Sequence, residues 1–200
     1  MERLYIYTMK RIVSFAAFLL FAVMANAQKP LLALNENNRY VYYQVVDLPG
    51  ISADSLKKNS AGFVKIQYPK NSAKKITDTG IYVKDKFLTY TNIILKREDG
   101  EMVYTLNIEC KKAKYRYWIT DFVFTPYEKD RYGQLVPKPG ITIPLETAKD
   151  KFAKKELDEY MNQTTAFCKQ LTDKLKLYMV TGHELKKIEH QPAKVVTDKW

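Results

Sequence analysis

The sequence is short of the residues from which several classes of protein are built. Two Cys and two His among 200 residues exclude a disulfide-rich scaffold, and the two Cys lack the spacing of a metal site. Seven Gly exclude a collagen-like chain. No G-x-S-x-G, H-E-x-x-H, Walker or dinucleotide-binding motif occurs. We therefore expect no metal and no cofactor, and an enzyme is the less favoured interpretation.

What the sequence does contain is aromatic residues and basic charge. It has 15 Tyr, 9 Phe and 2 Trp, 46% hydrophobic residues, and 33 Lys plus Arg against 22 Asp plus Glu, for a net charge of +11. This hydrophobic content is sufficient for a core and excludes a globally disordered chain. The length predicts one domain with appendages.

The first 27 residues have the three parts of a secretory signal peptide. Basic residues stand at Arg3, Lys10 and Arg11, an apolar run covers Ile12–Met24, and a small-residue site follows at Ala25–Ala27. A membrane span needs ~20 apolar residues, so this run is too short to be an anchor. We expect cleavage, export to the periplasm or beyond, and no transmembrane segment in the product. Residues 28–39 then form an N-terminal arm.

The segments that follow predict an α+β domain over residues 40–180. β-Branched and aromatic runs predict strands, and an antiparallel meander occupies the middle of the chain. Residues 84–86 suggest a kink and Asp99-Gly100 a hairpin turn. The predicted elements, in order, are a strand over 40–48, a helix over 52–68, strands over 80–96, 102–110 and 115–126, a Pro-rich loop over 127–144, and a helix over 145–180. Residues 181–200 read as a flexible tail.

Four stretches together resemble the secreted Bacteroidetes family known as domain of unknown function 4468. They are Leu48-Pro49-Gly50 followed by a helix, the Asp99-Gly100 hairpin, the strand Tyr115-Arg116-Tyr117-x-x-Thr120-Asp121-Phe122, and the Pro-rich loop before the long helix. The resemblance implies a TATA-binding-protein-like (TBP-like) fold, with a curved antiparallel sheet and two helices on one face in the order β-α-β-β-β-β-α. It requires a strand at residues 73–78, where the sequence signal is weak. It carries no catalytic residue and no activity.

The two cysteines leave two interpretations open. Cys110 lies on the apolar face of its strand, and Cys168 flanks the apolar stripe of the last helix. If that helix packs on that face, the sulfurs could form a disulfide in an oxidising compartment. The alternative is two separate buried thiols.

Asp121 is the acidic residue in the most unusual place, because it interrupts an apolar strand. Pairing with a basic neighbour such as Arg116 is the simpler interpretation. The alternative function is a small envelope hydrolase or transferase in which Asp121 and Glu101 or Glu109 form an acid pair. The two histidines, His183 and His190, lie in the tail without a catalytic partner.

The aromatic residues of the strands are the most suggestive feature. Since helices cover one sheet face, some of these rings should lie on the open face beside basic groups, where they could bind a ligand. The leading hypothesis is therefore a non-enzymatic binding module for an envelope glycan, peptide or protein, with nucleic acid an unlikely partner. The candidate binding residues are Tyr43, Tyr115, Arg116, Tyr117, Trp118 and Asp121.

Overall fold

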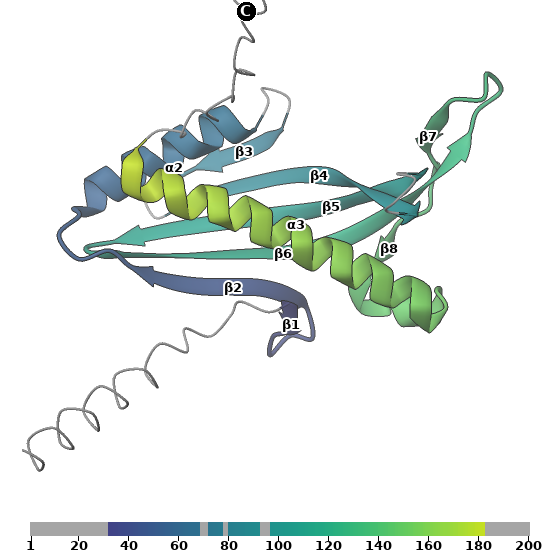
Figure 1. Cartoon of the computed structure of the whole chain (residues 1–200), viewed down its shortest axis with the longest axis horizontal. Coiled ribbons are helices and arrows are strands. Elements are labelled where there is room, and N and C mark those ends of the chain that lie inside the picture. Colours follow the sequence, from purple (N-terminus) through teal and green to yellow (C-terminus); the bar gives the residue numbers. More distant parts are fainter. Residues whose placement is uncertain (1–31, 69–71, 78–79, 93–96, 183–200) are drawn as a thin grey trace, which may run out of the picture. The chain divides into compact units, whose positions relative to one another are not determined.

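The computed structural model describes residues 32–68, 72–77, 80–92 and 97–182, which form an α+β fold (Figure 1). An open antiparallel sheet has the strand order β1-β2-β6-β5-β4-β3, and two short strands pair with β6. The strands are β1 (Leu32–Leu34), β2 (Tyr40–Asp47), β3 (Ala73–Ile76), β4 (Ile81–Asn92), β5 (Arg97–Lys111), β6 (Lys114–Lys129), β7 (Leu135–Pro137) and β8 (Ile143–Pro144). The helices are α2 (Ala53–Gln67), the 3-10 helix η1 (Leu145–Asp150) and α3 (Lys154–Thr181). The predicted fold class is confirmed.

Helix α2 begins and ends where its sequence predicts. The Ser52 Oγ accepts a hydrogen bond from the Ser55 amide, which caps the first turn. The inward side of the helix carries Leu56, Phe63 and Val64, all buried. The predicted helix over 145–180, by contrast, is two helices. Residues 151–153 are not helical and separate η1 from α3. Helix α3 ends at Gly182, whose φ of 72° fits a glycine cap.

Strand alternation separates the sheet into a covered face and an open face. On β5, the buried Met102, Leu106 and Ile108 face α2 and α3, together with Tyr115 and Tyr117 of β6 in the same core. The intervening residues form the open face. One row of paired residues crosses that face from β2 to β4 and consists of Tyr43, Trp118, Asn107 and Tyr82. Four tyrosines of the strands, Tyr42, Tyr104, Tyr115 and Tyr117, are buried in the core, while Tyr43, Tyr82 and Trp118 lie on the open face.

Three local predictions are wrong. β4 runs unbroken through residues 84–86. Asp99 and Gly100 lie inside β5, which begins at Arg97 opposite Asn92 of β4. Gly100 is needed for a close approach, since a Cβ there would stand 2.5 Å from the Phe124 ring. The Pro-rich segment after residue 127 is also not an open loop, because β6 continues to Lys129 and β7 pairs back on it.

The domain begins before the predicted boundary. β1 lies within the predicted N-terminal arm, yet it pairs with β2 through Leu32, Ala33 and Leu34. β3 supplies the strand that the family resemblance required. The predicted signal peptide and all but the first two residues of the predicted tail, with both histidines, lie outside the described residues. Among the helices of the described ranges, none combines the length and apolar character that a membrane span requires.

Candidate functional site

A β-bulge at Asp121 creates the most unusual backbone on the open face. Val103 pairs with Val123 and Thr105 pairs with Thr120, so β6 holds one extra residue at this point. Asp121 takes a φ of 56°, a left-handed conformation that Asp tolerates better than most residues. The bulge is the reason why Thr120 lies on the open face while Phe122 is fully buried.

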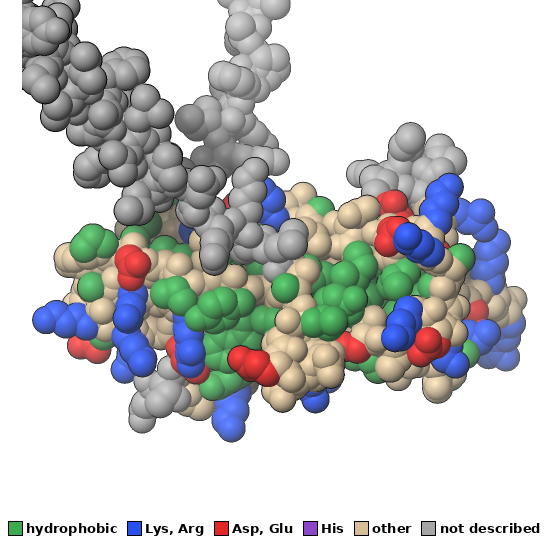
Figure 2. Space-filling model, turned by 90° about the horizontal axis from the view of Figure 1, so that it is seen from below, with side chains coloured by type: hydrophobic (Ala, Val, Ile, Leu, Met, Phe, Trp, Pro, Cys, Tyr) green, Lys and Arg blue, Asp and Glu red, His purple; other side chains and the backbone are tan. Residues whose placement is uncertain are grey.

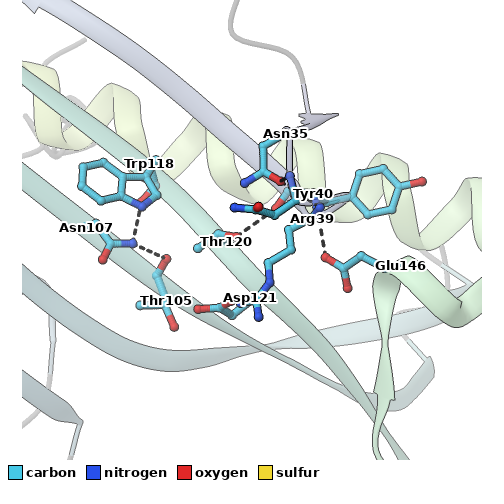
Figure 3. A network of polar contacts seen from close by, with 10 residues as sticks. Asn35, Arg39, Tyr40, Thr105, Asn107, Trp118, Thr120, Asp121 and Glu146 are labelled. Atoms are coloured by element: carbon cyan, nitrogen blue, oxygen red, sulfur yellow. Dashed lines mark hydrogen bonds and ion pairs between the residues drawn. The ribbon is translucent and has the colours of Figure 1, made fainter.

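The turn between β1 and β2 folds toward this bulge. The Asn35 Oδ1 accepts hydrogen bonds from the amides of Asn37 and Arg39, both at 3.0 Å, which closes a tight turn. Asn38 adopts the left-handed conformation with a φ of 53°. As a result, the Arg39 Nη1 lies 2.6 Å from the Asp121 Oδ1 (Figure 3). Among the described residues other than glycine, only three have a positive φ, and Asn38 and Asp121 are two of them.

The Arg39–Asp121 ion pair borders two depressions of the surface. The larger hollow has a volume of about 560 Å³ and is lined by Asn35, Asn37, Arg39, Val41, Asn107, Trp118, Thr120 and Asp121. The smaller hollow, of about 370 Å³, is lined by Asn37, Asn38, Arg39, Asp121, Phe122, Val123, Pro144 and Glu146. Both hollows are open to solvent rather than enclosed, and Asn, Arg and Asp side chains form much of their walls. Both also have residues from the β1–β2 turn and from the bulge in their walls.

Several polar groups of the larger hollow make no hydrogen bond to another described residue and are open to solvent. Within the described ranges, the side-chain amide of Asn37 makes no hydrogen bond, and neither do the Asn107 Oδ1 and the Trp118 Nε1. The Asn107 Nδ2 donates weakly to the Thr105 and Trp118 carbonyls, at 3.5 and 3.3 Å. Thr120 is already occupied, since its hydroxyl donates to the Tyr40 carbonyl at 3.1 Å. The free groups are thus donors and acceptors grouped around an indole ring.

A second cluster lies beside the larger hollow on the same face. The Arg116 guanidinium stands 5.3 Å from the centre of the Trp118 ring and donates to the Glu109 Oε2 at 2.6 and 2.7 Å. The hydrogen bond to Glu109 raises the pKa of Arg116, and Tyr43 contributes in the same direction. Arg116 is therefore bound to a carboxylate and an aromatic ring of its own face. β1 and β2 also expose Leu34, Tyr43 and Val45. These strands lie at the bottom of Figure 1. Figure 2, which is viewed from below, shows hydrophobic side chains among charged ones on this side of the molecule.

The predicted binding residues divide between the two faces. Tyr43, Arg116, Trp118 and Asp121 lie on the open face or at its bulge, but Tyr115 and Tyr117 are 1% and 0% exposed beneath the helices. Burial raises the pKa of both buried tyrosines. The Tyr117 hydroxyl donates to the Gln44 Oε1 at 2.6 Å. Successive side chains of a strand point to opposite faces. Arg116 and Trp118 can therefore contact a ligand on the open face, and Tyr115 and Tyr117 cannot.

Neither cysteine forms a disulfide, so the interpretation with two separate thiols is the one the structure contains. Cys168 is fully buried on α3, and burial raises the pKa of its thiol. Cys110 is half-buried on β5, where its Sγ lies 3.8 Å from the Ser60 Oγ of α2. Cys110 therefore lies against α2, whereas Cys168 is buried on α3.

The expected acid pair does not form, and Asp121 does not pair with Arg116. Glu109 binds Arg116, while Glu101 binds Lys86 at 2.7 Å. Opposite these two acids stand Arg116 and Thr125, four or five residues along β6 from Asp121, which is about 13–16 Å at strand spacing. The acid that shares a hollow with Asp121 is Glu146, which also accepts a hydrogen bond from the Tyr40 amide at 3.0 Å.

Sequence reasoning missed the residues of the β1–β2 turn, Asn107 and Glu146. The turn precedes the first strong strand signal, and Glu146 falls in the first turn of the helix predicted over residues 145–180. The run Asn35 to Asn38, with three Asn among four residues, is the one available signal, since Asn favours turns and left-handed conformations. In the described ranges, no three His, Cys, Asp or Glu side chains are grouped as a metal site would require.

Comparison with known proteins confirms the family resemblance and the fold. Residues 42–125 match the family model described as a domain of unknown function (DUF4468) with TBP-like fold. The solved structure of a TBP-like protein from Parabacteroides distasonis superposes with a TM-score of 0.61 at 15% identity, covering 75% of this chain and 97% of that one. A DUF4468 family protein from Bacteroides ovatus gives a TM-score of 0.54 at 13% identity, covering 75% and 92%. No curated protein matches the chain. At these identities the structural likeness shows the fold alone.

Proposed function

We propose that this chain is an exported, non-enzymatic binding module that holds its ligand in the larger hollow on the open sheet face. The observation that carries the proposal is the set of unpaired polar groups around Trp118. The Asn37 amide, the Asn107 Oδ1 and the Trp118 Nε1 make no hydrogen bond within the described ranges, and all three residues line one hollow. Asn37 is exposed, and neither the Asn107 Oδ1 nor the Trp118 Nε1 is sealed from solvent, so all three groups are open to a ligand.

The backbone around the hollow supports the same proposal. A residue other than glycine costs free energy when its backbone is in the left-handed conformation, and such residues are often found at binding and catalytic sites. Asn38 and Asp121 come from segments far apart in the sequence, and Arg39 joins them through its ion pair. An exposed ion pair of this kind stabilises a fold by only about 0.2–1 kcal/mol, so stability is a weak reason for its presence. Holding the walls of a binding site is a better one.

A binding screen tests this proposal directly. The ¹⁵N-labelled protein is titrated with envelope glycans, peptides and anionic polymers while its amide resonances are followed by NMR. We expect one class to shift the amides of residues 35–39 and 118–121. The matched control is the Tyr132→Ala variant, since Tyr132 is 73% exposed on the turn before β7 and lines neither hollow. If no ligand class shifts those amides, or if the shifts map to α2 and α3, the proposal is wrong.

A hydrolase or transferase is the second candidate, in a form different from the predicted one. Its only support is that Asp121 and Glu146 line the smaller hollow together. Paired carboxylates can divide acid and base roles when they share a cleft. A turnover assay on any glycan or peptide that binds, with the Glu146→Gln variant beside the wild type, separates the two functions. Product formation that this substitution abolishes favours the enzyme, and binding without turnover favours the module.

A further inference from the structure

The charged groups around the larger hollow are already neutralised by one another. Arg39 binds Asp121 at 2.6 Å, and Arg116, beside Trp118, binds Glu109 at the same distance. A charged ligand would have to break one of these pairs or leave its own charge unmatched. The net charge of +11 therefore says little about this hollow, because both arginines near it have carboxylate partners. An uncharged ligand meets no such cost.

The free hydrogen-bonding groups are of both kinds. The Trp118 Nε1 can only donate, the Asn107 Oδ1 can only accept, and the Asn37 amide can do both. A ligand that satisfies all three needs several groups able to donate and accept at short spacing. Hydroxyl groups have this property. A peptide, by contrast, satisfies its backbone best along a free sheet edge, whereas Asn107 and Trp118 lie on a sheet face and Asn37 lies in the β1–β2 turn.

The hollow also has an apolar component. The Trp118 indole and the half-buried Val41 are both in its lining, and Asn107, 5% exposed, lies in the adjacent strand. A pyranose ring presents C–H groups to an aromatic surface and hydroxyls at its edge, so it can use the indole and the amides together. A volume of about 560 Å³ is large enough for a ligand of more than one small ring.

We infer that the ligand of the larger hollow is an uncharged carbohydrate, which contacts the Trp118 indole and bonds its hydroxyls to the Trp118 Nε1 and to the side chains of Asn37 and Asn107. This inference rests on the proposed function and narrows it to one ligand class. It assigns the aromatic part of the contact to Trp118 and leaves Tyr115 and Tyr117 to the core. It also implies that affinity depends little on salt, since no ion pair forms between protein and ligand.

Calorimetric titration with neutral oligosaccharides, and with carboxylated or sulfated ones of the same backbone, tests the inference. We expect neutral sugars to bind equally well at low and high salt. The Trp118→Ala variant should bind about tenfold more weakly, which is the loss of one aromatic contact. Asn37→Ala should weaken binding about three- to tenfold, the range for one hydrogen bond. Tyr132→Ala should leave it unchanged.

The outcomes separate this inference from the proposed function. Because the Asn37 side chain makes no hydrogen bond within the described ranges, its variant should fold even if Trp118→Ala does not. Binding of anionic glycans alone, or of peptides alone, at the hollow would overturn the carbohydrate inference and leave the binding module standing. Neutral-sugar affinity unchanged in both variants would also overturn it. If no ligand class moves the resonances of the hollow, both are wrong.

Discussion

The bulge at Asp121 predicts an inverted order of stability for two substitutions. In a regular strand Ala is more stable than Gly by roughly 0.5–1 kcal/mol, because Gly loses more conformational freedom on folding. At Asp121 the backbone has a φ of 56°, where Ala costs about 1–2 kcal/mol and Gly costs nothing. Asp121→Gly should therefore be at least as stable as Asp121→Ala, by up to about 1.5 kcal/mol. Both variants lose the same ion pair, so its contribution cancels in the comparison.

The matched control is Thr125, which lies in the regular part of β6 opposite Glu101. There Thr125→Ala should be more stable than Thr125→Gly, so the order reverses between two sites on one strand. The difference between the two comparisons isolates the left-handed cost of about 1–2 kcal/mol. A third variant, Asp121→Asn, tolerates the backbone and loses only the exposed pair with Arg39. This variant should lower the free energy of unfolding by about 0.2–1 kcal/mol, and by less at high salt.

Urea unfolding followed by circular dichroism measures all five variants, since the midpoint shifts in proportion to stability when the slope is constant. The reasoning fails if Asp121→Ala is more stable than Asp121→Gly by the same margin as at Thr125. That result would mean that residue 121 has an ordinary extended backbone. The register shift that turns Asp121 toward Arg39 would then be absent, and the hollows it borders with it.

Three further predictions concern other parts of the chain. Gly100→Ala should destabilise the protein by about 1–3 kcal/mol, because its Cβ would stand 2.6 Å from the Thr125 carbonyl oxygen; an unchanged urea midpoint would contradict this. Burial raises the pKa of both thiols and so lowers the fraction present as reactive thiolate. Near pH 8 we therefore expect Cys168 of the native protein to resist a thiol reagent and half-buried Cys110 to react slowly, whereas both should react once urea unfolds the protein. A disulfide-linked mass would argue against this. When the full-length sequence is expressed in a bacterium, intact-mass spectrometry of the purified protein should give a chain that begins at Gln28, and an uncleaved mass would refute the predicted signal peptide.

The fold was predictable because its main elements have strong local signals. Ser52 caps a helix, and Met102 to Cys110 alternate as a half-buried strand should, so the α+β class follows from residue patterns alone. The hairpin prediction at Asp99-Gly100 failed because a Gly has two uses. It can supply a turn, or it can admit a close neighbour, and here the Phe124 ring occupies the space that a side chain would need.

The candidate site was only partly predictable, since it depends on contacts between distant segments. Asp121 drew attention because it interrupts an apolar strand, but its partner Arg39 is 82 residues away in a turn without a strong signal. On β6, Tyr115, Tyr117 and Trp118 suit either side, and only the charge of Arg116 indicates which face is solvated. The helices decide that Tyr115 and Tyr117 are buried, and this depends on the packing of the whole sheet.

The central claim is that a ligand occupies the larger hollow beside Trp118, and the indole resonance of this residue tests it most directly. The chain has two Trp, so the indole region of a ¹H–¹⁵N spectrum should hold two cross-peaks, from Trp118 and Trp200, and Trp118→Phe assigns them. We predict that a neutral oligosaccharide shifts the Trp118 Nε1–H peak in a saturable way and leaves the Trp200 peak in place. Saturable binding elsewhere on the protein with an unmoved Trp118 peak would contradict the claim.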